Sequence, residues 1–447
     1  MRNHGYNTAV KDGRRKVLSY KQMDDRINSI AASMLAADVK VGSKVAVFQE
    51  PTSDWVCSVL AILRIGAVYV PLDLRIPLIR LADIVYNCQP HAILSHAPTT
   101  KDTSALMSDA ARIINVSTVP ESTSVSIPTM ACPDSPAAIL YTSGSTGTPK
   151  GTILKHSSLS NQMEAYAAKL RFSSETVLQQ TAYSFDMSLW QLFMAISNGG
   201  AVYVVSKDMR GDSRALTKVI SAEHITLTCA TPSEYVAWLL YGITECMQRS
   251  EWRIAFSGGE PITDVLTHEL RALNKSQLRL TNCYGPTEIT CSSNSFEVPY
   301  QSESFHLKPL QGRAPAGYTL PNYAVYILDE HMKPVPAGIP GEIAIGGAGV
   351  AAGYLNNEEL TRSRFLPDTF ADAEYLSMGW TTMHLTGDRG RLQSDGALLC
   401  HGRVDGDTQI KLRGIRIDLN DISSSLIQSA NGVLANASIS IRGTMID

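Results

Sequence analysis

The chain has 447 residues, 44% of them hydrophobic, so it can bury a large core, and its length suggests two or three subdomains. A net charge of −3 argues against nucleic acid or an anionic membrane as a partner. Eight cysteines occur without Cys-x-x-Cys spacing, which argues against a disulfide framework or a zinc site. The polar N-terminus lacks the apolar core of a signal peptide, and we expect a cytoplasmic protein.

Apolar, β-rich runs alternate with amphipathic segments along most of the chain. Helices are expected at 20–37 and 159–170, and strands at 45–48, 68–70, 92–95, 201–205 and 253–256. Residues 55–72 read as a helix leading into a buried strand, because Arg64 and Pro71 interrupt any membrane-like run. The polar stretch 97–136 is expected to be surface loop with short elements. Such alternation predicts βαβ units and largely parallel sheets covered by helices.

The pattern changes after about residue 324 to short strands with frequent glycine, such as 324–328 and 342–345. This change predicts a smaller, β-rich and barrel-like part. We therefore expect a large N-terminal core over 1–404, made of α/β subdomains at about 1–323 and a β-rich subdomain at about 324–404. Residues 405–447 would form a hinge and a partial C-terminal subdomain.

The most informative segment is the run of hydroxyls and glycines from Thr142 to Lys150, which follows a strand-like apolar stretch. Glycine allows positive φ and close backbone approach, and successive N–H groups can form an anion-binding nest around a phosphate. The segment is not the P-loop of nucleotide hydrolases, in which Gly-Lys-Ser/Thr opens a helix, because Pro149 precedes Lys150 here. A Ser/Gly linker is the alternative, but the flanking strand and the Pro-Lys-Gly ending favour a nucleoside triphosphate site.

The same segment closely resembles the phosphate loop of the adenylate-forming superfamily, which includes acyl-CoA ligases, luciferases and the adenylation domains of nonribosomal peptide synthetases. Other motifs of that family follow in order, at 18–23, 63–73, 185–188, 282–288, 341–343, 353–355, 386–388, 402–403 and 409–414. The form of the last motif resembles that of fungal polyketide synthase–peptide synthetase hybrids. The resemblance implies two helix-covered, largely parallel sheets, a β-barrel-like part and a truncated α+β C-terminal subdomain.

The resemblance also implies that a carboxylate attacks the α-phosphorus of ATP, with Mg²⁺ as cofactor. Such chemistry depends on positioning and charge neutralisation. Lys150, Thr287 and Glu288 would be catalytic, and Glu288 would be the magnesium ligand. The residues expected to contact ATP are Thr142, Ser143, Gly144, Ser145, Thr146, Gly147, Lys150, Gly259, Glu260, Asn282, Tyr284, Gly285, Thr287, Asp388 and Arg403.

Within that set, Tyr284 would stack on adenine, while Asp388 and Arg403 would hold the ribose. Each assignment has a structural alternative: a solvated surface lysine for Lys150, a buried turn around Tyr284, and a surface turn at Asp388. His384 replaces a residue that is usually tyrosine in the family, and Leu385 replaces the basic residue that follows it, which removes a possible cation near the nucleotide.

Asp186 decides the substrate class. In the Phe-Asp-x-Ser motif of peptide-synthetase domains this aspartate pairs with the α-ammonium of an amino acid; a helix N-cap is the alternative role. Counting from the motifs places the amino-acid pocket at Asp186, Met187, Trp190, Cys229, Phe256, Gly258, Cys283, Cys291 and Ser292. Beyond Asp186 this wall carries no charge, so we expect an apolar, branched aliphatic side chain.

The implied partner is a peptidyl carrier protein whose phosphopantetheine thiol receives the amino acid, beside a condensation domain of the same assembly line. The hinge aspartate would be Asp407, with Asp405 as the alternative, and Lys411 would act in thiolation. The late Pro-x-x-x-x-Gly-Lys motif, whose lysine contacts the acyl carboxylate and the phosphate in the family, is absent. We therefore expect the chain to bind both substrates but to adenylate slowly. A freestanding acyl-CoA ligase and a non-catalytic nucleotide-binding remnant are the alternative functions.

Overall fold

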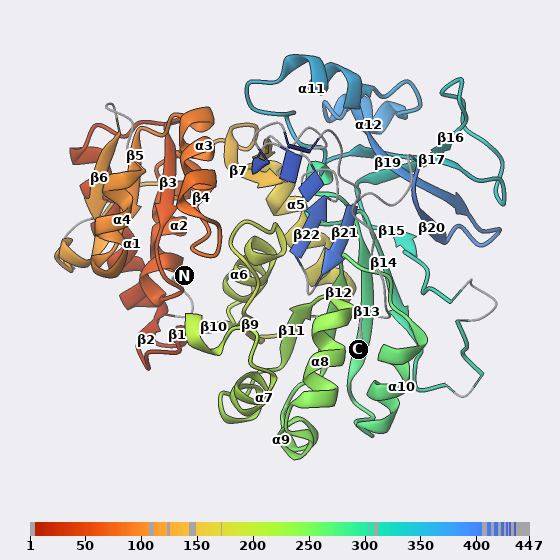
Figure 1. Ribbon diagram of the computed structural model, residues 1–447, viewed down its shortest axis with the longest axis horizontal. Helices are drawn as coiled ribbons and strands as arrows, with labels where there is room; N and C mark the ends of the chain where they lie inside the picture. The colour runs from red at the N-terminus through yellow and green to blue at the C-terminus, as the bar shows by residue number, and fades with distance from the viewer. Residues whose placement is uncertain are drawn as a thin grey trace.

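The computed structural model describes residues 5–106, 111–122, 126–142, 149–170, 172–302, 304–307 and 312–404, and, beyond them, 409–412, 415–418, 422–423, 426–427, 429–430 and 433–434. In Figure 1 the N-terminal α/β part (red to orange), the central α/β part (yellow to green) and a β-rich part (teal to blue) follow one another across the view. The described strands form three larger sheets and one two-stranded sheet.

The first α/β part contains a six-stranded sheet. Its strands, in spatial order, are β6 (Arg112–Asn115), β5 (Ala92–Ser95), β3 (Lys44–Phe48), β4 (Val68–Pro71), β7 (Pro136–Thr142) and β8 (Lys150–Lys155). All neighbours pair in parallel except β7 and β8, which are antiparallel. The helical elements of this region are α1 (Tyr20–Ala36), α2 (Ser53–Arg64), α3 (Leu78–Cys88), α4 (Thr100–Ala105), η2 (Ala97–Thr99) and η3 (Val116–Thr118).

The second α/β part contains a nine-stranded sheet, mixed but parallel at its centre. Its order is β15 (Tyr318–Thr319), β14 (Asn294–Val298), β13 (Arg279–Tyr284), β12 (Ile254–Gly258), β11 (Leu227–Ala230), β9 (Thr176–Gln179), β10 (Ala201–Val204), β1 (Thr8–Asp12) and β2 (Val17–Ser19). The helical elements of this region are α5 (His156–Leu170), α6 (Met187–Ser197), α7 (Ser213–Ala222), α8 (Pro232–Tyr241), α9 (Thr244–Arg249), α10 (Asp264–Ala272), η4 (Lys207–Met209) and η5 (Thr287–Ile289).

The β-rich part is an antiparallel sheet with the path β16 (Tyr323–Leu328), β17 (Gly341–Gly347), β19 (Thr382–Leu392) and β18 (Phe365–Pro367); β20 (Leu398–Arg403) also pairs with β19. Its helices are α11 (Glu358–Arg364) and α12 (Ala373–Ser377). Among the described strands no pairing closes this sheet into a barrel. Beyond it, β21 (Gln409–Leu412) and β22 (Ile415–Asp418) form a hairpin.

Local chemistry explains why the sequence forms these elements. The central strands β4, β5 and β11 are buried along their whole length, as expected of parallel strands covered on both faces. Helix α1 begins with a capping box, in which the Ser19 side chain accepts from the Gln22 N–H and the Gln22 side chain accepts from the Ser19 N–H. The cap therefore stops the helix from extending back into β2.

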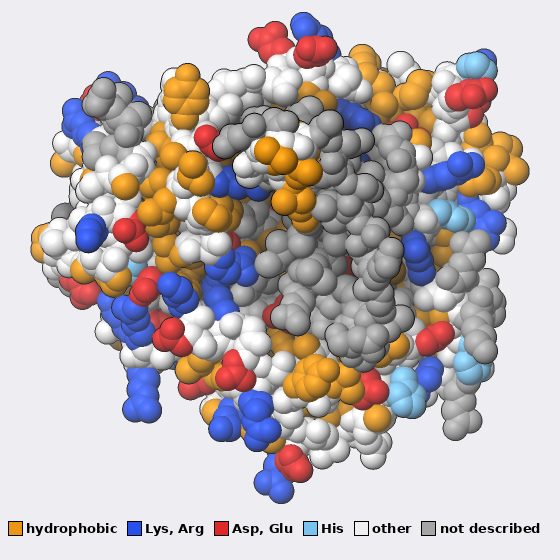
Figure 2. All heavy atoms as spheres, viewed as in Figure 1, with side chains coloured by type: hydrophobic (Ala, Val, Ile, Leu, Met, Phe, Trp, Pro, Cys, Tyr) orange, Lys and Arg blue, Asp and Glu red, His pale blue; other side chains and the backbone are white. Residues whose placement is uncertain are grey.

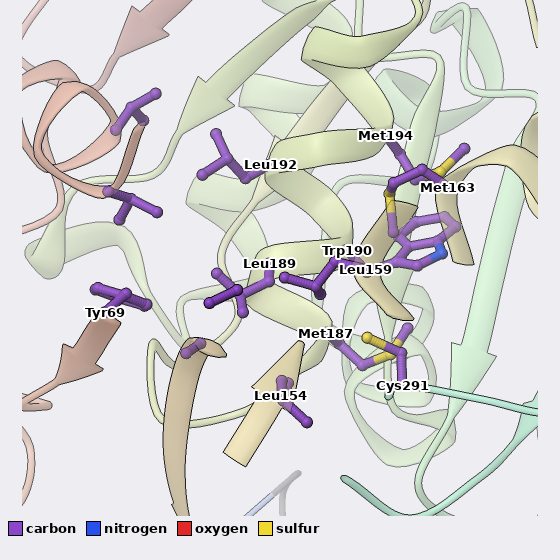
Figure 3. Close-up of a cluster of buried hydrophobic side chains, with 14 of the residues drawn as sticks. Tyr69, Leu154, Leu159, Met163, Met187, Leu189, Trp190, Leu192, Met194 and Cys291 are labelled. Carbon is purple, nitrogen blue, oxygen red and sulfur yellow. The ribbon is translucent and has the colours of Figure 1, made fainter. Parts of the chain in front are cut away.

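Helix α6 lies in the core between the two α/β parts. In Figure 3, Leu189 and Leu192 point from α6 toward Tyr69, while Trp190 and Met194 point toward Met163. All of these residues belong to one buried cluster. The position of α6 matters for function because its N-terminus carries Asp186.

Candidate active site

Lys150, Glu288 and Tyr354 come from three distant segments and meet in one cluster. Lys150 Nζ donates to Glu288 Oε1 at 2.8 Å, and the Tyr354 hydroxyl donates to the same oxygen at 2.8 Å. The Lys150 ammonium also lies 4.7 Å from the centre of the Tyr354 ring. Backbone bonds hold the three segments together: Ala351 N–H donates to the Glu288 carbonyl, and Leu355 N–H donates to the Gly151 carbonyl. Lys150 thus belongs to a largely buried cluster of side chains and is not a solvated surface lysine.

The electrostatics of Glu288 favour an ionised carboxylate. Burial alone would raise its pKa, but the charge of Lys150, the nearby His384 and the hydrogen bonds from Lys150 and Tyr354 together hold the pKa well below its usual range. Both of those hydrogen bonds go to Oε1. An ionised carboxylate with this geometry fits Mg²⁺, which takes one or two carboxylates together with phosphate oxygens and water. Among the described residues no group of three or more His, Cys, Asp or Glu could hold a metal without such outside ligands.

His384 lies on β19 beside this cluster and is buried. Burial lowers its pKa to about 4; Glu288 opposes the shift, whereas Lys150 adds to it. The imidazole is therefore neutral at pH 7. Its Nδ1 atom has no hydrogen-bond partner in the described part of the chain.

Tyr284, Asp388 and Arg403 form a second cluster. The Tyr284 hydroxyl donates to Asp388 Oδ2 at 2.6 Å, and Arg403 Nη1 lies 3.1 Å from Asp388 Oδ1. Arg403 also donates to the Thr386 carbonyl at 2.8 Å, which fixes the guanidinium beside the carboxylate. The residues predicted for adenine and ribose are thus brought together from β13, β19 and β20.

The remaining predicted nucleotide residues surround these clusters. Asn282 donates to the Pro315 carbonyl at 2.7 Å, and the Glu260 carboxylate accepts from both the backbone N–H and the hydroxyl of Ser233. Gly259 follows β12 with φ +87° and is exposed. Thr287 is buried.

The site has no space for a side chain at Gly285, and at Thr142 it carries a buried hydroxyl without a partner among the described residues. A Cβ on Gly285 would lie 2.5 Å from the Cα of Ser292, so the turn after Tyr284 has no space for a side chain. The Thr142 hydroxyl, at the end of β7, is buried and has no partner among the described residues. An unpaired buried hydroxyl is costly, and it fits a ligand-facing position at the start of the predicted phosphate loop.

Asp186 is buried at the entrance to α6, where its side chain makes no capping hydrogen bond to the helix. The N-cap alternative therefore does not explain it. The Cys291 thiol donates to the Asp186 carbonyl at 3.6 Å, and Cys291 follows Glu288 by only three residues. The backbone of Asp186 thus lies beside the segment that carries the predicted metal ligand.

The wall of the predicted amino-acid pocket is aromatic at one side. Trp190 and Phe256 are fully buried and stack with ring centres 4.3 Å apart. Tyr166, which the sequence did not single out, meets both rings edge-on and shares a hydrogen bond of 2.7 Å with Ser292. Figure 3 shows Met187 and Cys291 on the same side of Trp190. Cys229, Cys283 and Cys291 form no disulfide, and burial raises the pKa of the Cys229 and Cys291 thiols.

A family profile described as AMP-binding enzyme matches residues 1–355. The chain belongs to the AMP-binding enzyme family. It is 48% identical over 434 residues to the hybrid PKS-NRPS synthetase traA of Penicillium crustosum. That alignment covers 97% of this chain and 11% of the relative, so the chain spans only a small part of the curated protein.

Solved structures agree with this membership of the AMP-binding enzyme family. A four-domain nonribosomal peptide synthetase, solved with AMP and glycine bound, is 27% identical with a TM-score of 0.73, covering 95% of this chain and 30% of that one. A peptide-synthetase protein with adenylation and PCP domains, bound to a vinylsulfonamide inhibitor, is 25% identical with a TM-score of 0.79, covering 96% of this chain and 70% of that one. The predicted resemblance to peptide-synthetase adenylation domains and the α/β fold are confirmed.

Some predicted residues of this AMP-binding enzyme lie outside what the structure describes. These are Ser143, Gly144, Ser145, Thr146, Gly147, Asp405 and Asp407. Only the backbone of Lys411 is described, in β21. None of the helices in the described part of the chain is long and apolar enough to cross a membrane.

Sequence reasoning missed the roles of Tyr354 and Tyr166. Tyr354 stands in a recognised motif, Gly353-Tyr354-Leu355, so a signal was present, but its contact with Glu288 spans 66 residues and could not be counted from the motif. Tyr166 carries no motif signal. Only the packing of α5 against α6 brings it to Trp190.

Proposed function

We propose that this chain activates an amino acid as aminoacyl-AMP, using ATP and releasing pyrophosphate. The observation that carries the proposal is Asp186, a buried carboxylate without a capping role, set in an otherwise uncharged wall beside the Glu288 segment. A buried carboxylate favours a cation beside it. The α-ammonium of an amino acid would be such a cation, whereas a fatty acid carries none.

The side chains divide the work of the reaction. Asp186 would hold the ammonium and so orient the substrate carboxylate toward the α-phosphorus. Tyr284, Asp388 and Arg403 would fix adenine and ribose, and Lys150 would neutralise phosphate charge. Magnesium, held by Glu288 and phosphate oxygens, would supply further charge neutralisation. A substrate carboxylate oxygen then bonds to the α-phosphorus as the bond to the pyrophosphate oxygen breaks.

We further propose that the substrate side chain is apolar. Met187, Trp190, Cys229, Phe256, Cys283 and Cys291 offer no counter-charge, so a charged side chain would be buried without a partner. The stacked pair of Trp190 and Phe256 fills volume and favours a branched aliphatic side chain over an indole.

Transfer to the phosphopantetheine thiol of a carrier protein would complete the function. The support is the likeness to hybrid synthetases and to a peptide-synthetase protein that itself contains a PCP domain. A neighbouring condensation domain would then receive the loaded amino acid. The predicted hinge at Asp407 or Asp405 and the thiolation role of Lys411 belong to this part of the proposal.

Amino-acid-dependent exchange of labelled pyrophosphate into ATP tests the proposal. Leucine, isoleucine or valine should outcompete lysine, arginine and glutamate by at least about a hundredfold, because burying an unpaired charge costs several kcal/mol. Exchange driven by fatty acids alone would identify an acyl ligase. No exchange with any of the twenty amino acids or the fatty acids would identify a non-catalytic nucleotide-binding protein.

A further inference from the structure

A cavity of about 960 Å³ adjoins the predicted amino-acid pocket. Met187, Cys229 and Gly258, which are pocket residues, also line this cavity. From there it extends to the exposed Arg75 and Arg214, so it connects the pocket wall with the surface. Most of the residues that line this space belong neither to the nucleotide clusters nor to the predicted amino-acid wall.

The outer end of the cavity is cationic. Arg75, Lys207, Arg210 and Arg214 all line it. Arg75 is paired with Asp73 at 3.0 Å, and the Arg210 guanidinium lies 4.8 Å above the ring of Tyr183. Figure 2 shows acidic and basic side chains interspersed over the face of the molecule that it draws, so the small net charge does not describe any one region of the surface. A group of lysines and arginines at a cavity mouth suits a phosphate ester.

Three acidic side chains line the same cavity: Asp73 (paired with Arg75), Asp212, and Glu234 from the first turn of α8. The Glu234 Oε2 atom lies 3.5 Å from the side-chain nitrogen of Gln180, and that nitrogen donates to the Cys229 carbonyl at 2.8 Å. One amide group thus separates the Glu234 carboxyl from the wall of the amino-acid pocket.

The surroundings of Glu234 set its protonation near neutral pH. Burial raises its pKa to about 7, with Gln180 lowering it, Glu260 raising it, and Arg210 and Arg75 lowering it. A carboxyl with this pKa is matched to proton transfer at physiological pH. The adenylation step does not need it, since that step is achieved by positioning and charge neutralisation.

We propose that Glu234 accepts the proton of the thiol that discharges the aminoacyl-adenylate. The inference rests on the proposed function. The thiol sulfur bonds to the acyl carbon, the bond from that carbon to the phosphate oxygen breaks, and AMP leaves with its electron pair. The thiol proton passes to the Glu234 carboxylate. A thiol has a pKa of about 8.5, so at pH 7 it needs such an acceptor to become the reactive thiolate.

A single-turnover experiment on the chain tests this role. Aminoacyl-AMP is formed in the presence of pyrophosphatase, 4′-phosphopantetheine is added, and the aminoacyl thioester is quantified between pH 6 and 9. In the wild type the rate should rise with pH through about 7 and then level off, because only ionised Glu234 accepts a proton. In Glu234→Gln the rate at pH 7 should fall about a hundredfold or more. In this variant the rise of the thioester rate with pH should move to higher pH, toward the pKa of the thiol itself.

Glu234→Asp keeps a carboxylate and should restore part of the rate. Glu245→Gln, the same change at an exposed glutamate of α9, serves as the matched control and should keep the wild-type profile. Equal thioester rates in Glu234→Gln and wild type, or no thioester from wild type that does exchange pyrophosphate, would overturn the inference. So would a change in amino-acid preference in Glu234→Gln, which would place the carboxyl at the substrate side chain. If the wild type showed no amino-acid-dependent pyrophosphate exchange at all, the proposed function itself would be contradicted.

Discussion

The carboxylate of Asp186 is buried in a wall that carries no other charge. We predict that Asp186→Ala abolishes amino-acid binding while leaving ATP affinity nearly intact. Removing one partner of a buried ion pair costs about 3–5 kcal/mol, or on the order of several hundredfold in affinity. Isothermal calorimetry with the preferred amino acid measures the loss. Asp83→Ala, at an exposed aspartate of α3, is the control; unchanged amino-acid affinity in Asp186→Ala would refute the ammonium role.

His384 gives a residue-scale prediction about pH. Its pKa is about 4 in the folded chain and about 6.5 in the unfolded one, so the unfolded chain binds the extra proton between these values. Stability is therefore greatest above about pH 6.5 and falls as the pH drops toward 4, by about 3 kcal/mol at most. Glu288, whose pKa is lowered from its ordinary value of 4.5, loses its own stabilising contribution only as the pH falls below that value.

Urea unfolding at pH 7, 6 and 5 should show a smaller decline in His384→Gln, which cannot take up the proton. His331→Gln, at an exposed histidine, should decline as the wild type does. A decline in His384→Gln as steep as that of the wild type would mean that His384 is not the group responsible.

At the scale of elements, the register of β12 against β13 sets the pocket. Gly258 pairs with Cys283 across these parallel strands, and a Cβ on Gly258 would overlap the Cys283 sulfur. We predict that Gly258→Ala lowers amino-acid-dependent pyrophosphate exchange by about tenfold or more, since overpacking costs about 1–3 kcal/mol. Adding Cys283→Ala should restore part of the activity by removing the sulfur. Full activity in Gly258→Ala would show that this contact does not shape the pocket.

Elements whose chemistry is local could be predicted well. The strand 92–95 has the same bounds in the structure, and the helix expected at 20–37 ends one residue earlier, at Ala36. Strand β6 was hidden within the polar stretch 97–136, because it is an edge strand that is only partly buried. Its pattern therefore lacks the continuous apolar run of a central strand.

The candidate site likewise contains residues that short motifs identify and contacts that only the folded chain creates. Motifs identified Lys150, Glu288, Asp388 and Asp186, because each lies in a short contiguous pattern. The contact between Lys150 and Glu288 spans 138 residues and depends on how two sheets pack. Glu234 stands outside every recognised motif, and only the cavity and its partial burial distinguish it from a surface glutamate of a helix.

For the whole molecule, the predicted boundary after residue 404 remains a prediction. Limited trypsin digestion of the native chain should cut first between Arg403 and Arg413 and leave a long-lived N-terminal fragment. The reason is that the preceding β-rich part is tied to both α/β parts, for example by the Leu355 N–H at the Gly151 carbonyl of the first and by Asp388 at Tyr284 of the second. Mass spectrometry of the fragments identifies the cut. First cleavage within 324–404 would contradict the boundary.

The segment from Ala348 to Leu355 binds three separate parts of the molecule. The Ala348 carbonyl accepts from Ser158 on α5, the Gly349 carbonyl accepts from Thr290, and Tyr354 pairs with Thr152 on β8. Anyone who exchanges segments between related synthetases to change their products therefore faces a constraint. A crossover near residue 323 would combine the 348–355 segment of one parent with the Ser158, Thr290 and Thr152 contacts of the other, and any mismatch between them would shift Glu288. Crossovers that take this segment and its contact residues from the same parent should preserve activity more often.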